Sequence, residues 1–273
     1  MLKASQLARS VFYYHQARCQ LADKYADVKE AIKRLFNEHK GRYGYRRMTY
    51  ALKGLGYRYN KKTVQRLMQA LNLKSWVRPR RYRSYRGQVG RTADNILHRN
   101  FKAEKPNQKW VTDVTEFKVG EQRVYLSPVI DLFNQEVVTY RVATNARLPL
   151  VTEMLKDALD KLRTQYKKED RPKPVFHSDQ GWQYQHHEVH KLLKKNGLKQ
   201  SMSRKGNCLD NAVAENFFGI LKTEMYHRQK FRDAEHLIEE IKQYIEYYNT
   251  KRIKVKLKGL SPIEYRNQAL SAA

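Results

Sequence analysis

The hydrophobic pattern of this chain changes its period near residue 109, and the change limits the folds that the chain can adopt. Before that point apolar residues recur at the spacing of a helix with one buried face. Beyond it the pattern becomes strand-like, and turn sequences separate one strand from the next. The sequence therefore predicts a helical domain at the front of the chain and an α/β domain behind it.

The front domain is predicted to hold three helices after a weaker one in residues 1–22. They cover residues 28–39, 44–54 and 60–71. Asn60 is a favoured N-cap residue, and the Gly54-Leu55-Gly56 turn precedes it. Two short helices separated by a glycine turn are typical of a helix-turn-helix that binds DNA, and the alternative is a bundle whose charged face is only solvated. The expected DNA contacts on the second of these helices are Lys61, Lys62, Gln65 and Arg66.

The charge distribution indicates a nucleic acid as the partner. The net charge is +28, and residues 1–105 hold 26 Lys and Arg against 6 Asp and Glu. Such a field favours polyanions over membranes or acidic small molecules. Residues 74–91 contain basic side chains and no acid, with aromatic residues between them, so we interpret them as a linker that becomes ordered on DNA. Its expected contacts to DNA are Arg78, Arg80, Arg81 and Arg83.

Several other classes of protein are disfavoured by what the sequence lacks. Cys19 and Cys208 are its two cysteines and form no CxxC or Cys/His cluster, so neither a disulfide framework nor a structural zinc site is expected. No apolar run approaches the roughly 18 residues of a membrane span, and the N-terminus lacks the apolar segment of a signal peptide. We therefore expect a cytoplasmic protein with no membrane partner.

The second domain is predicted to be a mixed sheet covered by helices. Its predicted strands are residues 110–117, 123–132, 136–143, 174–177 and 198–202. Its predicted helices are residues 150–162, 187–195, a helix that starts at Asp210 or Asn211, and 234–248. The expected domains are residues 1–73 (helix-turn-helix-like), 74–105 (basic linker), 106–230 (α/β) and 231–273 (C-terminal helix and basic tail).

Three acids of this domain stand where a metal site can form. Asp113 lies mid-strand among apolar residues, where an ionised carboxylate is costly unless it is paired or bound to a cation. Asp179 follows a short apolar strand, at the end where α/β sheets place their sites. Glu215 lies a turn inside a helix, where a plain surface Glu is the alternative. Oxygen ligands favour Mg²⁺ or Mn²⁺, and two ions roughly 4 Å apart would act on a phosphodiester.

Residues beside these acids are candidates for supporting roles. A side-chain oxygen of Asp210 or Asn211 is expected to cap the helix that carries Glu215. The predicted buried stripe of that helix is Val213, Phe217, Ile220 and Leu221. His177 precedes Asp179 by two residues and is expected to orient it. The expected contacts to DNA phosphates beside the site are Arg204, Lys205 and Lys222, and for the last of these a solvated lysine is the alternative.

Three motifs carry the acids in a fixed order. The first is Trp110-Val-Thr-Asp113-Val-Thr-Glu-Phe, and the second is His177-Ser-Asp179-Gln-Gly-Trp-Gln-Tyr184. The third runs from Ser201 to Lys222, and thirty-five residues separate its Glu215 from Asp179. Together with Tyr247-Tyr-Asn-Thr-Lys-Arg252 and Gly259-Leu-Ser-Pro-Ile-Glu-Tyr-Arg266, they resemble the DDE transposases of the insertion sequence three family, over a stretch from about Lys40 to Arg266.

The resemblance implies an RNase H-like mixed sheet with helices, the fold of an integrase catalytic core, behind the helix-turn-helix-like domain. It implies cleavage of DNA at the ends of a bacterial insertion sequence and transfer of the freed 3′-hydroxyl into DNA, with Asp113, Asp179 and Glu215 as catalytic metal ligands. The alternatives are a non-catalytic DNA-binding regulator of transposition and a simple RNase H-like nuclease. Three intact carboxylates argue against the regulator, and the basic front domain argues against the nuclease.

The resemblance also implies the partners of the protein. They are the terminal inverted repeats of the element, the target DNA and further copies of this chain, because two element ends must be brought together. The chain resembles the second-frame protein, OrfB, which is often fused to a first-frame protein, OrfA, that carries its own helix-turn-helix. The expected location is the bacterial cytoplasm, on the nucleoid.

Overall fold

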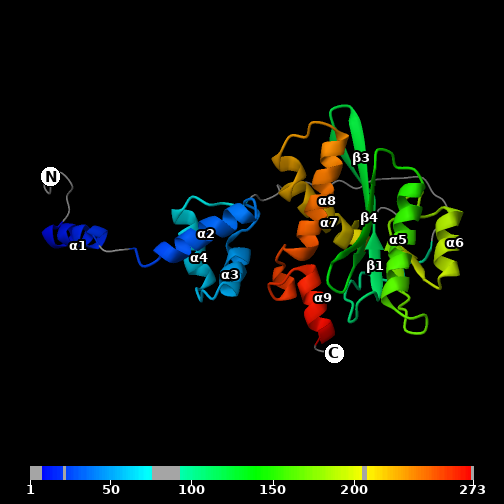
Figure 1. The fold of residues 1–273 in the computed structure, drawn as a ribbon, viewed down its shortest axis with the longest axis horizontal. Helices are drawn as coiled ribbons and strands as arrows, with labels where there is room; N and C mark the ends of the chain where they lie inside the picture. Colours follow the sequence, from blue (N-terminus) through cyan, green and yellow to red (C-terminus); the bar gives the residue numbers. More distant parts are fainter. Residues whose placement is uncertain (1–7, 21–22, 76–92, 205–207, 272–273) are drawn as a thin grey trace. The chain divides into compact units, whose positions relative to one another are not determined.

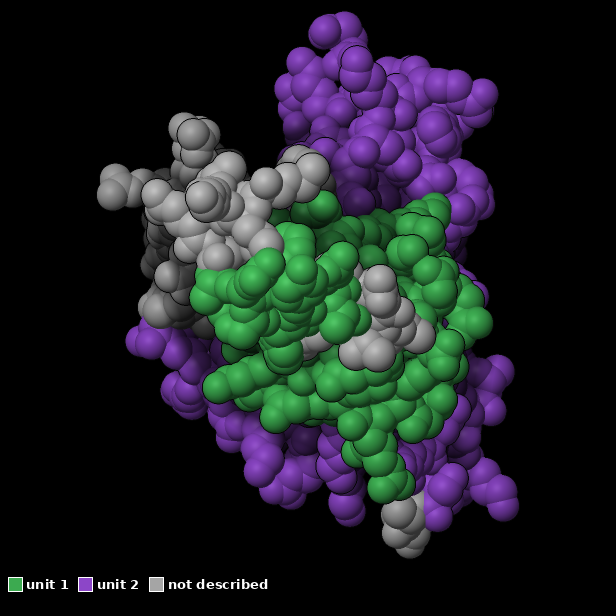
Figure 2. All heavy atoms as spheres, turned by 90° about the vertical axis from the view of Figure 1, so that its left-hand side faces the viewer, with its two compact units in different colours: residues 1–75 green, residues 76–273 purple. Residues whose placement is uncertain are grey.

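The computed structural model describes residues 8–20, 23–75, 93–204 and 208–271, and the chain divides into two compact units (Figure 1). Residues 1–75 form the first unit and residues 76–273 the second, as the two colours of Figure 2 show. The first unit is helical and the second contains a mixed sheet, as the change of period predicts. Predicted DNA contacts that lie outside the described residues are Arg78, Arg80, Arg81, Arg83 and Lys205.

The described residues of the first unit form four helices. They are α1 (Arg9–Gln20), α2 (Ala26–Glu38), α3 (Tyr45–Gly54) and α4 (Lys61–Ala70). Helices α2, α3 and α4 each bury one apolar face, whose residues include Ile32, Met48, Leu52, Val64 and Leu67. The Asn60 side chain accepts a hydrogen bond of 3.1 Å from the backbone N–H of Lys62, which confirms the predicted cap of α4.

The outer face of α4 carries the basic residues that the sequence proposes as DNA contacts. Lys61, Lys62, Gln65 and Arg66 are all exposed. The Arg66 guanidinium lies 5.6 Å from the centre of the Tyr25 ring, a cation–π distance that steadies a long side chain on the surface. The surface of α4 is therefore a cationic face backed by an apolar core, and contact with DNA stays a prediction.

Within its described residues, the second unit is built on a mixed sheet of six strands. Its strands are β1 (Lys109–Thr112), β2 (Thr115–Val119), β3 (Gln122–Asp131), β4 (Val137–Ala143), β5 (Val175–Ser178) and β6 (Gln200–Met202). Strand β3 pairs antiparallel with β4 on one side and with both β1 and β2 on the other. Strand β5 pairs parallel with β1 and with β6, so the sheet is mixed, as predicted.

The sequence predicts one strand over residues 110–117, and this prediction is wrong in one respect. The structure interrupts it at Asp113 and Val114, although β1 and β2 keep the same register on β3. The Val114 N–H donates to the Asp113 carboxylate (Oδ1) at 2.7 Å instead of to a strand, a local competition typical of Asp. Pro128, which has no N–H to donate, lies on β3 at this level. Asp113 therefore follows β1 instead of lying mid-strand.

Helices cover both faces of the sheet, because successive residues of a strand point to opposite sides. Val111 packs in a core with α7 (Ala212–Glu224) and α8 (Ala234–Thr250). Its neighbour Trp110 packs in a second core with α5 (Pro149–Gln165) and α6 (His187–Lys195). Figure 1 shows these two pairs of helices on opposite sides of the strands. Helix α8 thus shares one core with the sheet.

The segment predicted as a basic tail is folded in the structure. It contains a short 3-10 helix (Val255–Leu257) and α9 (Pro262–Ser271). Arg252 is buried and donates to Glu224 at the end of α7, with a shortest distance of 2.7 Å. Arg266 reaches Glu136 at 2.7 Å. A buried arginine is tolerated only when a carboxylate compensates its charge, so these pairs hold the C-terminal segment against the sheet unit.

No helix in the described part of the chain combines the length and the apolar composition of a membrane-spanning segment.

We expect Asn60→Ala to destabilise α4 by about 1 kcal/mol, because the N–H of Lys62 would lose its partner. Hydrogen exchange of the amides in the first turns of α4 measures this change directly. The matched control is Asn60→Asp, which keeps a side-chain acceptor and should retain the protection. Equal protection in wild type and Asn60→Ala would contradict the role of this cap.

Candidate active site

Three elements bring the predicted acids to one edge of the sheet. Asp113 follows β1 and Asp179 follows β5, and these two strands are adjacent and parallel, so the two acids lie at the same end of the sheet. Glu215 lies in the first turn of α7, whose residues pack against the same sheet. The carboxyl end of parallel strands is where α/β proteins place their sites. The structure therefore collects the acids from three distant parts of the sequence.

The acids influence one another electrostatically. Burial raises the pKa of Asp113 well above its usual range, and the charge of Asp179 and then that of Glu215 raise it further. The pKa of Glu215 is raised by burial and by the charge of Asp179, and burial also raises the pKa of Asp179. Like charges that share a partly buried site disfavour ionisation. The site is therefore one that a cation would stabilise.

The chemistry of the donors fits a hard divalent cation. The three acids offer oxygen atoms alone, the ligands that Mg²⁺ and Mn²⁺ prefer. Asp113, Asp179 and Glu215 therefore form a donor set that suits such a cation. Among the described residues, a further group of possible metal ligands is His186, His187 and Glu188, whose ligand atoms lie within 4.8 Å of one another.

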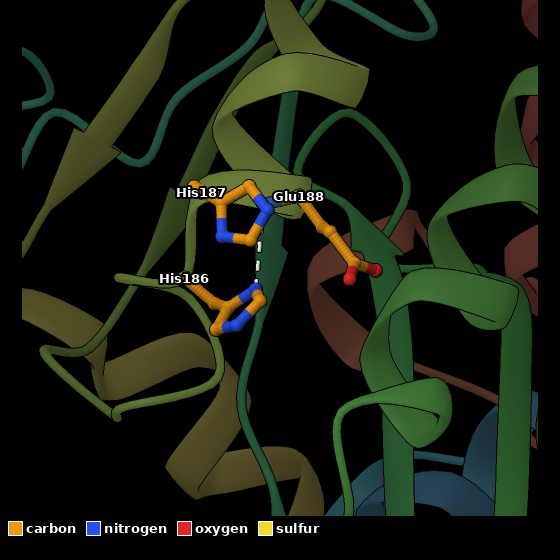
Figure 3. Close-up of side chains that lie close together, drawn as sticks. All are labelled: His186, His187 and Glu188. Atoms are coloured by element: carbon orange, nitrogen blue, oxygen red, sulfur yellow. Dashed lines mark hydrogen bonds between the residues drawn. The ribbon is translucent and has the colours of Figure 1, made fainter.

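The cluster of His186, His187 and Glu188 has a simpler structural explanation. The His186 side chain (Nδ1) accepts the backbone N–H of Glu188 at 3.4 Å and so caps the start of α6. Figure 3 shows the Glu188 carboxylate pointing away from the two imidazole rings. His187 and Glu188 are exposed. The capping bond explains this grouping without a metal ion.

The loop after β5 wraps closely around the Asp179 carboxylate. Its Oδ1 accepts the backbone N–H of Gly181 at 2.9 Å. A Cβ atom at position 181 would lie 2.9 Å from that same oxygen, so the glycine permits the close approach. Two aromatic residues follow: Tyr184 is buried, with its hydroxyl 3.0 Å from Thr112 Oγ1, whereas Trp182 is exposed. Tyr184 therefore packs the loop, and Trp182 remains accessible.

His177 is completely buried and joins three parts of the site. Its Nε2 lies 2.8 Å from the backbone oxygen of Asp210, and its Nδ1 lies 2.8 Å from Ser201 Oγ. A carbonyl only accepts, so Nε2 carries the hydrogen and Nδ1 accepts from the serine. Burial lowers the pKa of His177, in agreement with this neutral form. The ring thus links β5 to β6 and to the start of α7, and the orientation of Asp179 by His177 stays a prediction.

The predicted side-chain cap at the start of α7 is wrong. A 3-10 helix (Cys208–Asn211) leads into α7, and no side-chain cap bond forms at Asn211. Instead, Asn211 Nδ2 donates to the backbone oxygen of Thr112 at 3.1 Å, beside Asp113. The Asp210 carboxylate is bound by arginines. Tertiary partners have taken both side chains, which local propensity does not anticipate.

The predicted buried stripe of α7 is correct in part. Phe217 and Leu221 are buried, whereas Val213 and Ile220 are only half-buried. Phe218, which lies outside the predicted stripe, is buried as well. Helix α7 packs in one core with both the sheet and α8, so its buried face is wider than a single stripe.

Two of the predicted DNA contacts lie beside the acids. The Lys222 ammonium lies 5.0 Å from the centre of the Phe117 ring, and its charge lowers the pKa of Asp113. Arg204 pairs with Asp210 at 2.9 Å. The structure adds Arg99, which pairs with the same carboxylate at 2.8 Å. Sequence reasoning missed Arg99 because the surrounding segment has a linker-like composition and no periodic pattern.

Family models match both units of the chain. An HTH-like domain matches residues 23–82, and integrase core domains match residues 103–208 and 215–270. These matches and the mixed sheet define the class: the chain is a polynucleotidyl transferase with an RNase H-like integrase core, a class that uses divalent metal ions, behind an HTH-like DNA-binding domain. The predicted fold class is thereby confirmed.

Relatives narrow this class to one family. The chain is 53% identical to the putative transposase InsK for insertion sequence element IS150 of Escherichia coli (strain K12), over 98% of this chain and 93% of that protein. It is 33% identical to the transposase InsF for insertion sequence IS3A of the same organism, over 99% of this chain and 94% of that protein. The chain therefore belongs to the insertion sequence three family of transposases.

The chain is also similar to a solved structure, that of the HTLV-2 integrase catalytic core domain in complex with magnesium (dimeric form). The similarity covers 60% of this chain and 98% of that chain, with 16% sequence identity and a TM-score of 0.42.

We expect Asp210→Asn to lower the free energy of unfolding of residues 76–273 by about 2 kcal/mol at neutral pH, the scale of hydrogen bonds to a charged group. The arginines hold the pKa of Asp210 below its value in the unfolded chain. Its contribution is therefore present above roughly pH 5 and is lost as the pH falls further. Urea denaturation at several pH values should show the wild-type and variant stabilities converging in acid.

The control for this measurement is Asp157→Asn. Asp157 pairs with Arg141 at 2.7 Å but is 38% exposed, so its loss should cost less than about 1 kcal/mol. A stability gap between wild type and Asp210→Asn that stays constant down to about pH 3 would contradict the linkage.

Proposed function

We propose that Asp113, Asp179 and Glu215 hold two divalent ions, Mg²⁺ or Mn²⁺, and form the catalytic centre of this transposase. The observation that carries the proposal is the placement of the three acids after β1, after β5 and in the first turn of α7, where the charges of Asp179 and Glu215 add to burial in raising the pKa of Asp113. When bound, a pair of such ions activates the attacking oxygen of water or of a 3′-hydroxyl and stabilises the leaving oxygen of the phosphodiester. The carboxylates position the ions, and no covalent link between protein and DNA is needed.

The proposed reaction has two stages at one site. The transposase cleaves DNA at the terminal inverted repeats of its element and then joins the freed 3′-hydroxyl to target DNA. The Lys222 ammonium stands where it neutralises charge beside Asp113, as a phosphate contact at the site requires. We propose that the exposed face of α4 binds duplex DNA and that the basic side chains of the linker segment, residues 74–91, contact its phosphates.

The proposed assembly contains more than one copy of the chain. Two element ends must be cut and joined together, so we propose an oligomer on DNA, with the first-frame protein OrfA as a fusion partner or a complex partner. We place this assembly on the nucleoid, in the cytoplasm of a bacterium. A non-catalytic regulator with the same domains is disfavoured, because such a protein has no need to retain all three carboxylates.

We expect Asp113→Asn, Asp179→Asn and Glu215→Gln each to lower metal-dependent cleavage of element-end DNA on the order of a thousandfold, because each removes a charged oxygen ligand. Fluorescence anisotropy should show that DNA binding survives. Calorimetric titration with Mn²⁺ should show weaker metal uptake. Glu116→Gln, an exposed acid of β2, is the control and should cleave normally. Retained cleavage in any of the three would remove that residue from the site.

We expect Lys61→Ala and Lys62→Ala each to reduce the salt dependence of DNA binding by about one unit in a plot of log affinity against log salt, because each loses one phosphate contact. The affinity should fall about equally for all DNA sequences. Lys168→Ala, on the surface of the second unit, is the control of equal charge. Equal slopes for the two α4 variants and this control would show that α4 does not face the duplex.

A further inference from the structure

One carboxylate near the proposed catalytic centre is fully buried and lies outside the set of acids. Asp210 has no exposed side-chain surface and accepts five hydrogen bonds of 2.8–3.1 Å. The donors are Asn95 Nδ2, Arg99 Nε, and the Arg204 backbone N–H, Nε and NH2. The Arg204 guanidinium, with help from Arg99, holds the pKa of Asp210 well below its usual range. Asp210 is therefore ionised and saturated with donors, which makes it unsuitable as a metal ligand.

The two arginines turn their remaining donors outward. Their side chains are 44% exposed for Arg99 and 61% exposed for Arg204, although their partner is buried. A guanidinium has five N–H groups, and Asp210 engages one from the side chain of Arg99 and two from that of Arg204. The terminal N–H groups that remain form two planar forks, the geometry that matches phosphate oxygens. Two cations share one anion, so the cluster keeps a net positive charge.

Hydrogen bonds tie this cluster to the elements that carry the acids. The backbone oxygen of Asp210 accepts from His177, two residues before Asp179. The next residue, Asn211, donates to the backbone oxygen of Thr112, which precedes Asp113. The arginine pair therefore has a fixed position relative to β1, β5 and the start of α7.

We propose that Arg99 and Arg204, oriented by Asp210, form a phosphate clamp that holds the backbone of the DNA strand entering the catalytic centre. The clamp rests on the proposed function, since it acts on the same strand as the three acids. Arg99 and Arg204 are DNA-binding residues, and Asp210 is a positioning residue that never touches DNA. The clamp recognises phosphodiester oxygens and carries no base specificity.

The chain offers a matched control for the clamp. Arg141 pairs with Asp157 through the same two atoms that Arg204 uses on Asp210: Nε donates to Oδ2 at 2.7 Å and NH2 to Oδ1 at 2.9 Å. Its side chain is 48% exposed, between the values for the two clamp arginines. This pair joins β4 to α5, which packs on the face of the sheet opposite to α7. Arg141→Gln therefore removes an equivalent charge and ion pair without touching the clamp.

The test measures DNA binding by the full chain in a Glu215→Gln background, which prevents cleavage. The probe is a fluorescein-labelled duplex of random sequence, titrated by anisotropy at several salt concentrations. Arg99→Gln and Arg204→Gln should each weaken binding roughly tenfold, the effect of losing a charge-assisted hydrogen bond. Each should also lower the salt slope by about one, whereas Arg141→Gln should change both quantities much less.

Asp210→Asn makes the test sharper because the clamp predicts a change in DNA affinity opposite to the change that charge alone would cause. Removal of a negative charge by itself should tighten DNA binding, but loss of the positioning carboxylate should weaken it. Tighter binding by Asp210→Asn, or Arg99 and Arg204 variants indistinguishable from Arg141→Gln, would overturn the clamp. Thermal melting identifies any variant that fails to fold. In that case Arg99→Lys and Arg204→Lys provide the test of the clamp. They keep the positive charge but lose the planar fork of N–H groups, so they should still weaken DNA binding.

The same arginine variants, prepared with Glu215 intact, separate this proposal from the proposed function. If the chain with an intact Glu215, assayed both alone and together with OrfA, shows no metal-dependent cleavage of element-end DNA, the catalytic proposal fails whatever the arginines do. If it cleaves, and the arginine variants bind DNA as the Arg141→Gln control does, the clamp alone fails.

Discussion

The hydrogen bonds made by Asp210 and Asn211 hold together three elements that the sequence keeps far apart. Asn211 binds the end of β1 through Thr112, and the backbone of Asp210 receives the His177 ring from β5. Both residues stand directly before α7, so one short 3-10 turn connects all the acid-bearing elements. An acidic site needs such a junction, because its carboxylates repel one another and so oppose the close approach of the elements that carry them.

This acidic site lies in a strongly basic protein. The net charge of +28 favours the binding of polyanions such as DNA, whereas the carboxylates near Asp113 concentrate negative charge at one edge of the sheet. In our proposal, cations beside the acids position the phosphodiester that approaches this edge. Lys222 and the arginines bound to Asp210 are the cations proposed for this role. The same carboxylate that completes the fold thus orients positive charge toward solvent.

Much of this architecture is readable from the chain because it depends on local patterns. The cap at Asn60, the α/β alternation and the three acids follow from side-chain period and from the residues that flank each element. The failures have physical causes. The strand through Asp113 is interrupted because its carboxylate takes the next N–H. The expected cap at Asp210 is replaced by bonds to arginines that no periodicity connects to it.

The sequence by itself determined the two-part organisation and the family, since ordered motifs and hydrophobic periods are properties of the chain alone, and it supplied the three acids that we propose as metal ligands. Only the tertiary structure decided which side chains meet. It brought Arg99 from a linker-like stretch to Asp210, across more than a hundred residues, and tied Asn211 to β1 instead of to its own helix. The physical reason is that a buried polar group must form hydrogen bonds, and the fold determines which partners lie close enough to form them.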